Sequence, residues 1–153
     1  MANLLINVHC PSSNTKRLRD ALVNGAAHPD LANITVRVTE PLKATADDVF
    51  WADAVILGTT VNFGYMSGAM KDFFDRSYET CLEKTEGLPY AIALRGRSDA
   101  TGAKASMEKI VTGLKWRAVQ EPLLCIGDFK ESFVIEWQEL GLTVAAGLDS
   151  GIY

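Results

Sequence analysis

The first residues that could do chemistry follow an apolar run near the start of the chain, Leu4–Val8. They are small and rich in hydrogen-bonding groups: Ser12, Ser13, Asn14 and Thr15. The segment after them has helical periodicity, and a helix N-terminus presents unpaired N–H groups with partial positive charge. These hydroxyls and the amide could therefore surround a phosphate without a bound cation. The simpler alternative is that they only cap the helix.

Two later loops contain the other candidate residues. The loop after the third apolar run mixes polar and aromatic residues: Thr60, Val61, Asn62, Phe63, Gly64, Tyr65 and Met66. The loop after the fourth run has a glycine between two cations: Arg95, Gly96 and Arg97. Both loops are poor in the residues that act as general acids and bases. This poverty of ionisable residues fits chemistry that needs no general-base pair.

The elements that position these loops alternate between two types. Five short apolar runs predict strands at Leu4–Val8, Ile34–Val38, Ala54–Gly58, Tyr90–Leu94 and Val119–Cys125. Segments with helical periodicity follow them, near residues 18–26, 46–51, 70–81, 107–114 and 133–144. Alternating strands and helices predict an α/β fold, with helices on both faces of a five-stranded parallel sheet.

The strand order follows from which runs look half-exposed. The second run alternates apolar and polar residues, as an edge strand does, and the fifth contains Pro122, which cannot donate a ladder hydrogen bond. The other three runs are nearly continuous in apolar residues, as central strands are. These features predict the order 2-1-3-4-5, with a ligand site beyond the carboxyl ends of strands one and three. The three candidate loops should meet there.

Several other kinds of site are excluded by spacing. Neither GxGxxG nor GxxxxGK[ST] occurs in the chain, which argues against these two nucleotide-binding motifs. The interval between Cys10 and Arg17 does not match a small tyrosine phosphatase, so we do not expect a nucleophilic cysteine. The third run does not end in the aspartate that a receiver domain phosphorylates. No CxxC metal or redox pair is formed by the cysteines, which are Cys10, Cys81 and Cys125.

Composition and charge narrow the class of protein further. With 153 residues, 48% of them hydrophobic, we expect one domain spanning residues 1–153. The net charge of −4 gives no general attraction to nucleic acid or to an anionic membrane. The longest apolar stretches fall well short of the roughly 20 residues that a membrane helix needs. The odd number of cysteines and the N-terminus, which does not read as a signal peptide, lead us to expect a cytoplasmic protein.

The third loop also carries a family resemblance. The segment Gly58–Arg76, GTTVNFGYMSGAMKDFFDR, resembles a strand, loop and helix of flavodoxin-like NAD(P)H-dependent FMN and quinone oxidoreductases, which typically show PxYFGNMSGxxKxFxDR. The first loop, Cys10–Thr15, resembles the flavodoxin phosphate loop, and Asn14 and Thr15 match its last two members. The resemblance implies a flavodoxin-like three-layer sandwich that binds FMN.

By this resemblance, Ser12, Asn14 and Thr15 would hold the FMN phosphate, with Cys10 or its backbone nearby. Residues 60–66 would line the ribityl chain and the isoalloxazine ring. Phe63 and Met66 could instead serve only to pack beneath the loop.

Two positions depart from the family pattern. Ser13 stands where flavodoxins often have glycine, and Tyr65 stands where the family often has asparagine. The first departure bears on the tightness of the phosphate loop and the second on the contact at the flavin edge. Tyr65 is the aromatic residue that we expect nearest the flavin, and Ser67 is expected to cap the next helix.

The two arginines of the fourth loop have several interpretations. Arg95 or Arg97 near the pyrimidine end of the flavin would stabilise its anionic reduced form. Either could instead bind a phosphate of a nicotinamide cofactor, lie in solvent or pair with Asp99. Gly96 would let backbone N–H groups approach the flavin carbonyl oxygens.

These features predict an FMN-dependent oxidoreductase that takes electrons from NADH or NADPH and passes them to a small-molecule acceptor, such as a quinone or free flavin. The alternative is a flavodoxin-type electron carrier or a non-enzymatic flavin-binding protein. The absence of an aromatic residue from the fourth loop and the modest acidity argue against the carrier. Relatives in this fold often associate, so a homo-oligomer is also expected.

Overall fold

The computed structural model describes residues 1–153 as alternating strands and helices. The strands are β1 (Ala2–Val8), β2 (Ile34–Thr39), β3 (Ala54–Asn62), β4 (Tyr65–Met66), β5 (Pro89–Gly96), β6 (Arg117–Ala118) and β7 (Leu123–Ile126). The helices are α1 (Ser13–Ala26), α2 (Ala46–Trp51), α3 (Gly68–Cys81), α4 (Thr101–Gly113) and α5 (Glu131–Asp149). All the predicted helices are therefore confirmed, and each begins or ends within a few residues of its expected bounds.

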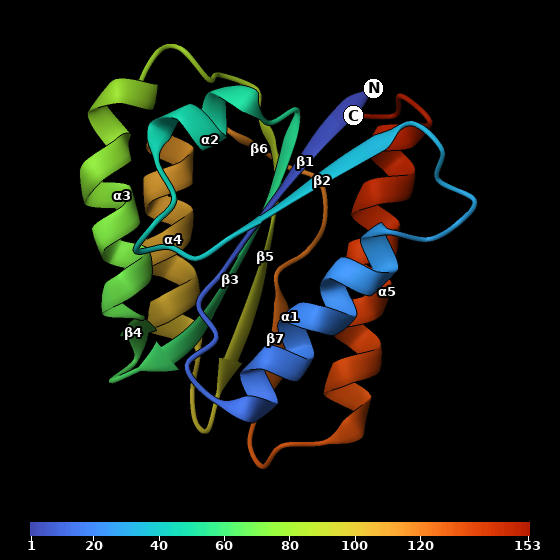
Figure 1. The fold of residues 1–153 in the computed structure, drawn as a ribbon. Coiled ribbons are helices and arrows are strands. Elements are labelled where there is room, and N and C mark those ends of the chain that lie inside the picture. Colours follow the sequence, from blue (N-terminus) through green and yellow to red (C-terminus); the bar gives the residue numbers. More distant parts are fainter.

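The sheet confirms the predicted strand order. Its strands follow one another as β2-β1-β3-β5-β6, with β7 also paired to β5, and all of these pairs are parallel. Counted by the main strands alone, this is 2-1-3-4-5, with β1, β3 and β5 in the middle of the sheet (Figure 1). Because the order reverses between β1 and β3, the loops that follow these strands leave the same edge in opposite directions.

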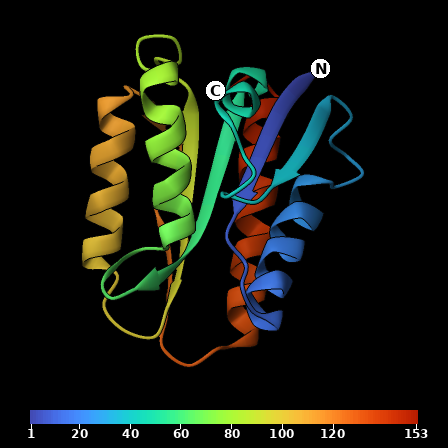
Figure 2. The same ribbon diagram turned by 60° about the vertical axis from the view of Figure 1, so that its left-hand side comes forward.

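Helices cover both faces of the sheet, as Figures 1 and 2 show. Successive strand residues point to opposite faces, so each central strand contributes to two separate cores. Leu4 and Ile6 pack in the core beneath α1 and α5, together with Leu18 and Trp137. Leu5 packs in the opposite core, which α2, α3 and α4 cover. The apolar runs of the sequence are thus explained by burial on both sides.

The fifth strand differs from the prediction. A single strand over Val119–Cys125 is wrong: β6 pairs with the start of β5, β7 pairs with its end, and residues 119–122 lie between them. Pro122 has no backbone N–H for the ladder, which accounts for the interruption just before β7. The break lies at the sheet edge, where the proline was expected. The loops at the carboxyl end of β5 are unaffected by it.

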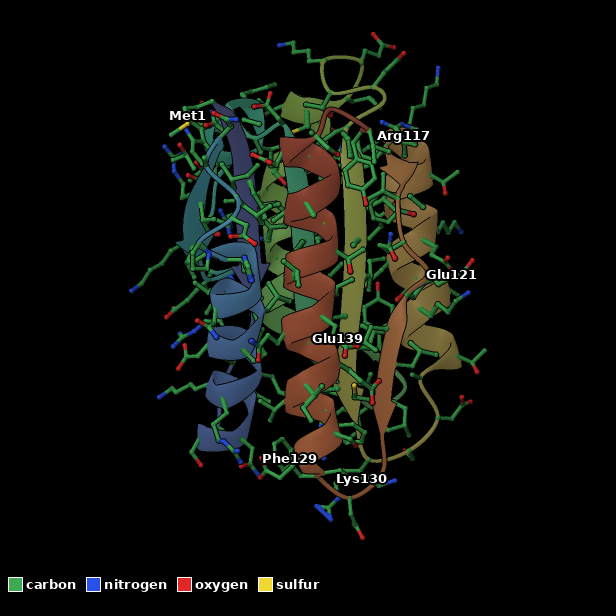
Figure 3. All side chains as sticks on the ribbon, turned by 90° about the vertical axis from the view of Figure 1, so that its right-hand side faces the viewer. Met1, Arg117, Glu121, Phe129, Lys130 and Glu139 are labelled. Carbon is green, nitrogen blue, oxygen red and sulfur yellow. The ribbon has the colours of Figure 1, made fainter.

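Helices α1 and α5 cross at a point of close backbone contact. A Cβ added to Gly25 would overlap the carbonyl oxygen of Gln138, and one added to Gly141 would overlap that of Leu22. Figure 3 shows α5 along this side of the molecule, with Phe129 and Lys130 at the carboxyl end of the sheet and Met1 at the other end. No helix is long and apolar enough to cross a membrane.

Candidate functional site

The loop after β1 is organised by the start of α1. Ser12 is the N-cap: its Oγ accepts a hydrogen bond from the Thr15 backbone N–H at 3.2 Å, and Thr15 Oγ1 accepts one from the Ser12 N–H at 2.9 Å. This reciprocal capping box fixes the loop with residues three positions apart. The capping role considered from the sequence is therefore present. Asn14, two residues after the cap, makes no side-chain hydrogen bond and is exposed.

The predicted loops meet around one cavity at the carboxyl end of the sheet. Its volume is about 430 Å³, within the usual range for small-ligand sites. Three loops line it, through Ser12, Asn14, Thr15, Thr60, Val61, Asn62, Phe63, Arg95, Gly96, Arg97 and Ser98. The switch point of the strand order therefore coincides with the cavity. Ser98 was not among the candidate residues, although its place in the loop after the fourth apolar run was a usable signal.

A hairpin forms the second wall of this cavity. β3 continues to Asn62 and pairs antiparallel with β4, so Asn62 faces Tyr65 across a two-residue turn. Both turn residues have left-handed backbone, with φ of 53° at Phe63 and 71° at Gly64, which matches the turn favoured in two-residue hairpins. The Phe63 side chain is fully exposed, at 107% of its reference area. The turn therefore projects an aromatic ring into solvent beside the cavity.

Two contacts hold the hairpin in place. At its exit, the Ser67 N–H donates to Thr59 Oγ1 at 3.1 Å, and Ser67 Oγ accepts from the Met70 N–H at 3.1 Å, so Ser67 caps α3 as predicted. At its tip, a Cβ added to Gly102 would overlap the carbonyl oxygen of Gly64. The start of α4 therefore touches the turn directly. Thr59 is a supporting residue that the sequence motif did not single out.

The fourth loop forms the third wall, and its two arginines differ in setting. Gly96 is buried, and a Cβ there would lie 2.8 Å from the Cβ of Val61, so this close approach needs glycine. Arg95 is half-buried and donates to backbone carbonyls. The Arg97 side chain is 85% exposed and lies 3.8 Å from Asp128. Neither arginine pairs with Asp99, whose carboxylate accepts hydrogen bonds from Thr101 that lower its pKa.

Five of the sequence-predicted residues lie outside the cavity lining: Cys10, Ser13, Gly64, Tyr65 and Met66. Cys10 faces a separate cavity of about 180 Å³, shared with His9, Lys16 and Glu40, and its Sγ accepts a hydrogen bond from Arg19 at 3.3 Å. Met66 is buried in the core under α3, which fits the packing alternative. The structure thus puts Phe63, rather than Tyr65, at the cavity.

The donor set of the cavity decides what it can hold. Hydroxyls and an amide from the first loop stand at the N-terminus of α1, where the helix dipole favours an anion. The only ionisable groups in the lining are Arg95 and Arg97, so the cavity offers no general acid or base. No cluster of three or more metal-ligating side chains occurs. These residues fit a ligand that combines a phosphate with an aromatic ring system bearing polar edges, as FMN does.

Comparisons with known proteins agree with this geometry. A flavodoxin from Aquifex aeolicus is 35% identical to this chain over 75 residues, which are 49% of this chain and 40% of that protein's length. A solved flavodoxin from the domain Archaea superposes with a TM-score of 0.79 at 18% identity, covering 97% of this chain and 99% of that one. A flavodoxin, WrbA-like protein from Agrobacterium tumefaciens gives 0.75 at 16% identity, with coverages of 98% and 99%. These structural neighbours establish the flavodoxin-like fold.

The family assignment rests on a longer match. Residues 12–131 match the family described as NADPH-dependent FMN reductase. The matched segment begins at the α1 cap, contains all three walls of the cavity and ends at the start of α5. It covers well over half of the sequence. The chain therefore belongs to the NADPH-dependent FMN reductase family.

Proposed function

We propose that this protein is an FMN-dependent oxidoreductase whose flavin binds in the three-walled cavity at the carboxyl end of the sheet. FMN bound there would supply two-electron chemistry, taking a hydride from NADH or NADPH and passing electrons to a quinone-like or flavin acceptor. The observation that carries the proposal is the coincidence of the switch-point cavity with the N-terminus of α1.

At the phosphate end, each lining residue has a defined task. Ser12 and Thr15 keep the first turn of α1 in register through their capping box, so the helix N-terminus faces the cavity. Asn14 has a free side-chain amide with which to donate to a phosphate oxygen. Ser13 and Cys10 lie outside the lining and have no assigned task in this proposal. All the residues that we assign to the phosphate in this loop therefore lie at the N-terminus of α1.

At the ring end, the walls are unequal. Phe63 offers one exposed aromatic face, whereas the other wall, formed by Gly96, Arg97 and Ser98, has no aromatic side chain. Gly64, Tyr65 and Met66 then serve to hold the turn that carries Phe63. A ring covered by an aromatic residue on one side only leaves room for a nicotinamide on the other. This asymmetry favours an enzyme that takes a hydride directly.

A second candidate function is a flavodoxin-type electron carrier. The Aquifex aeolicus flavodoxin match and the flavodoxins among the structural neighbours favour it. A carrier that docks a redox partner protein through charge would need charged side chains of one sign around the cavity. The rim here is mixed, because Arg97 stands opposite Asp128 and both are exposed. We therefore rank the carrier second.

One two-stage experiment separates these functions. The purified protein is first titrated with FMN while flavin fluorescence is followed, and saturable quenching is expected. The loaded protein is then mixed with NADH or NADPH without oxygen, and loss of the visible flavin absorbance is expected with at least one of them. Absence of FMN binding would remove both functions. Binding without bleaching by either nucleotide, but with bleaching by a flavodoxin reductase protein, would establish the carrier.

A further inference from the structure

Arg95 is held at the cavity wall by groups that leave its charge uncompensated. Its Nη1 donates to the carbonyl oxygens of Gly96 and Cys125, at 2.5 and 3.2 Å. The bond to Cys125 ties the end of β5 to the end of β7. Both acceptors are neutral, so the guanidinium is oriented but keeps its full positive charge.

Two aromatic rings fix the same guanidinium from the side of α5. Its central carbon lies 5.8 Å from the ring centre of Phe129 and 5.2 Å from that of Phe133. Arg17, from the first turns of α1, lies 5.5 Å from the Phe129 ring centre. Phe129 lies at the carboxyl end of the sheet in Figure 3. Because Phe129 contacts both arginines, it relates Arg95 to the first turns of α1, where the proposed phosphate site lies.

The ion pairs show why Arg95 is unusual. Arg17 has a carboxylate partner in Glu131, at 2.5 Å, and Arg97 approaches Asp128. No carboxylate lies within ion-pair distance of Arg95, although it is half-buried. Removing a cation partly from water costs free energy, and a bound anion can offset that cost. Arg117 also lacks a partner, but it is exposed and lies at the opposite end of the sheet (Figure 3).

We propose that Arg95 is the residue by which this cavity selects phosphorylated flavin over unphosphorylated flavin, an inference that rests on the FMN site proposed above. Arg95 lines the same cavity as Ser12 and Asn14. Its guanidinium shares the Phe129 ring with Arg17 of α1, so we assign its charge to the phosphate end of the cavity. Partial burial weakens solvent screening and strengthens this attraction. Riboflavin carries no phosphate and gains nothing from it. Arg95 thus determines specificity rather than the reaction itself.

The test compares FMN with riboflavin, using fluorescence titration of the flavin-free protein. The quantity measured is the ratio of the two dissociation constants. For Arg95→Gln, which keeps a donor for the Cys125 carbonyl, we expect the preference for FMN to fall about tenfold or more, the size expected for one partly buried unit charge. Arg117→Gln removes the same charge at the far end of the sheet and should leave the ratio within about twofold, because distance and salt screen it.

Further variants separate charge from structure. Arg95→Lys keeps the charge but loses the planar fork, so the melting temperature should fall while the ratio stays within about threefold of wild type. Arg97→Gln, at the exposed rim, should change the ratio less than Arg95→Gln does. If Arg95→Gln does not fold, Arg95→Met, which keeps the apolar stem against Phe129 and Phe133, takes its place: a tenfold fall in the ratio supports the proposal, and a ratio within about twofold of wild type overturns it.

The outcomes that overturn the inference are distinct from failure of the proposed function. If FMN binds and Arg95→Gln weakens FMN and riboflavin equally, Arg95 is only structural and the selection claim is wrong. If Arg97→Gln or Arg117→Gln lowers the ratio as much as Arg95→Gln, net charge rather than Arg95 sets the preference. If the wild-type protein binds neither flavin, the proposed function and this inference both fail.

Discussion

At two places in the molecule, two backbone segments approach so closely that a Cβ between them would overlap a carbonyl oxygen. The two contacts have different roles. At the crossing of α1 and α5, Gly25 and Gly141 put two helices in direct backbone contact within the buried core. At the rim of the cavity, Gly102 at the start of α4 touches Gly64 at the hairpin tip, and both glycines are exposed.

The two contacts differ in how far the backbone around them can move. In the core, the two helices are constrained along their length by the sheet below them, so a clash cannot relax locally. At the rim, the hairpin is a short projection held at its exit by Ser67, and its tip can shift. The same contact therefore supplies stability in one region and positions a binding loop in the other.

The largest effect is expected from Gly141→Ala. The added methyl would overlap the Leu22 carbonyl oxygen, so we expect a loss of about 3 kcal/mol or more in the free energy of unfolding. Urea denaturation measures this loss. Gly68→Ala, also in a helix but facing open space, is the matched control and should raise the stability by no more than about 1 kcal/mol. Equal effects at the two positions would show that the crossing is not tightly packed.

The next effect should follow Gly102→Ala, the equivalent change at the rim. The methyl would push against the Gly64 carbonyl oxygen, but the exposed turn can yield, so we expect a loss of only about 1 kcal/mol. FMN affinity should fall on the order of tenfold, because the Phe63 wall is displaced. Denaturation and fluorescence titration are both needed. Unchanged affinity would contradict the positioning role of this contact.

The core was more predictable from the sequence than the rim. Apolar runs such as Ala54–Gly58 are continuous because they are buried on both faces, and this pattern gave the central strands and their order. The close approach of Gly102 to Gly64 joins residues far apart in the chain and has no local signal. The split of the last strand was missed because one proline indicates an edge but not the exact break.

Ser12→Ala tests the other side of the rim. Loss of the N-cap hydroxyl should cost about 1 kcal/mol of stability, measured by urea denaturation. FMN affinity should also fall, because the helix start that faces the cavity loses its register. Riboflavin serves as the control ligand, since it has no phosphate to lose contact with. A parallel loss for both flavins would mean that Ser12 acts only as a cap.

The smallest effect is expected at Phe63. Its φ of 53° is unfavourable for a bulky residue, and Asn tolerates this region, so Phe63→Asn should raise stability by about 0.5 kcal/mol. FMN affinity should fall a few fold as the exposed ring is lost. Phe63→Ala is the control: it removes the ring without relieving the backbone. A stabilised variant with full FMN affinity would show that the strained phenylalanine has no part in binding.

The candidate site was predicted unevenly, for physical reasons. Ser12, Asn14 and Thr15 were found because a helix start and its cap are local in sequence. Tyr65 was expected nearest the flavin, yet it lies outside the lining, which Asn62 and Phe63 reach instead; this depends on how the hairpin is placed against the other loops, which local spacing does not encode. Arg95 and Arg97 differ in burial, and only Arg97 has a carboxylate nearby, in Asp128; no spacing in the sequence reveals either difference.

The central claim, that FMN binds between the first, third and fourth loops, is tested most directly by amide NMR during titration with FMN. We predict that the largest shift changes will fall in residues 12–15, 60–64 and 95–98, with the amide signals of the α1–α5 crossing almost unmoved. Shifts concentrated instead at the cavity near the C-terminus, lined by residues such as Val119, Gln120 and Tyr153, would contradict the claim, as would no shifts at all.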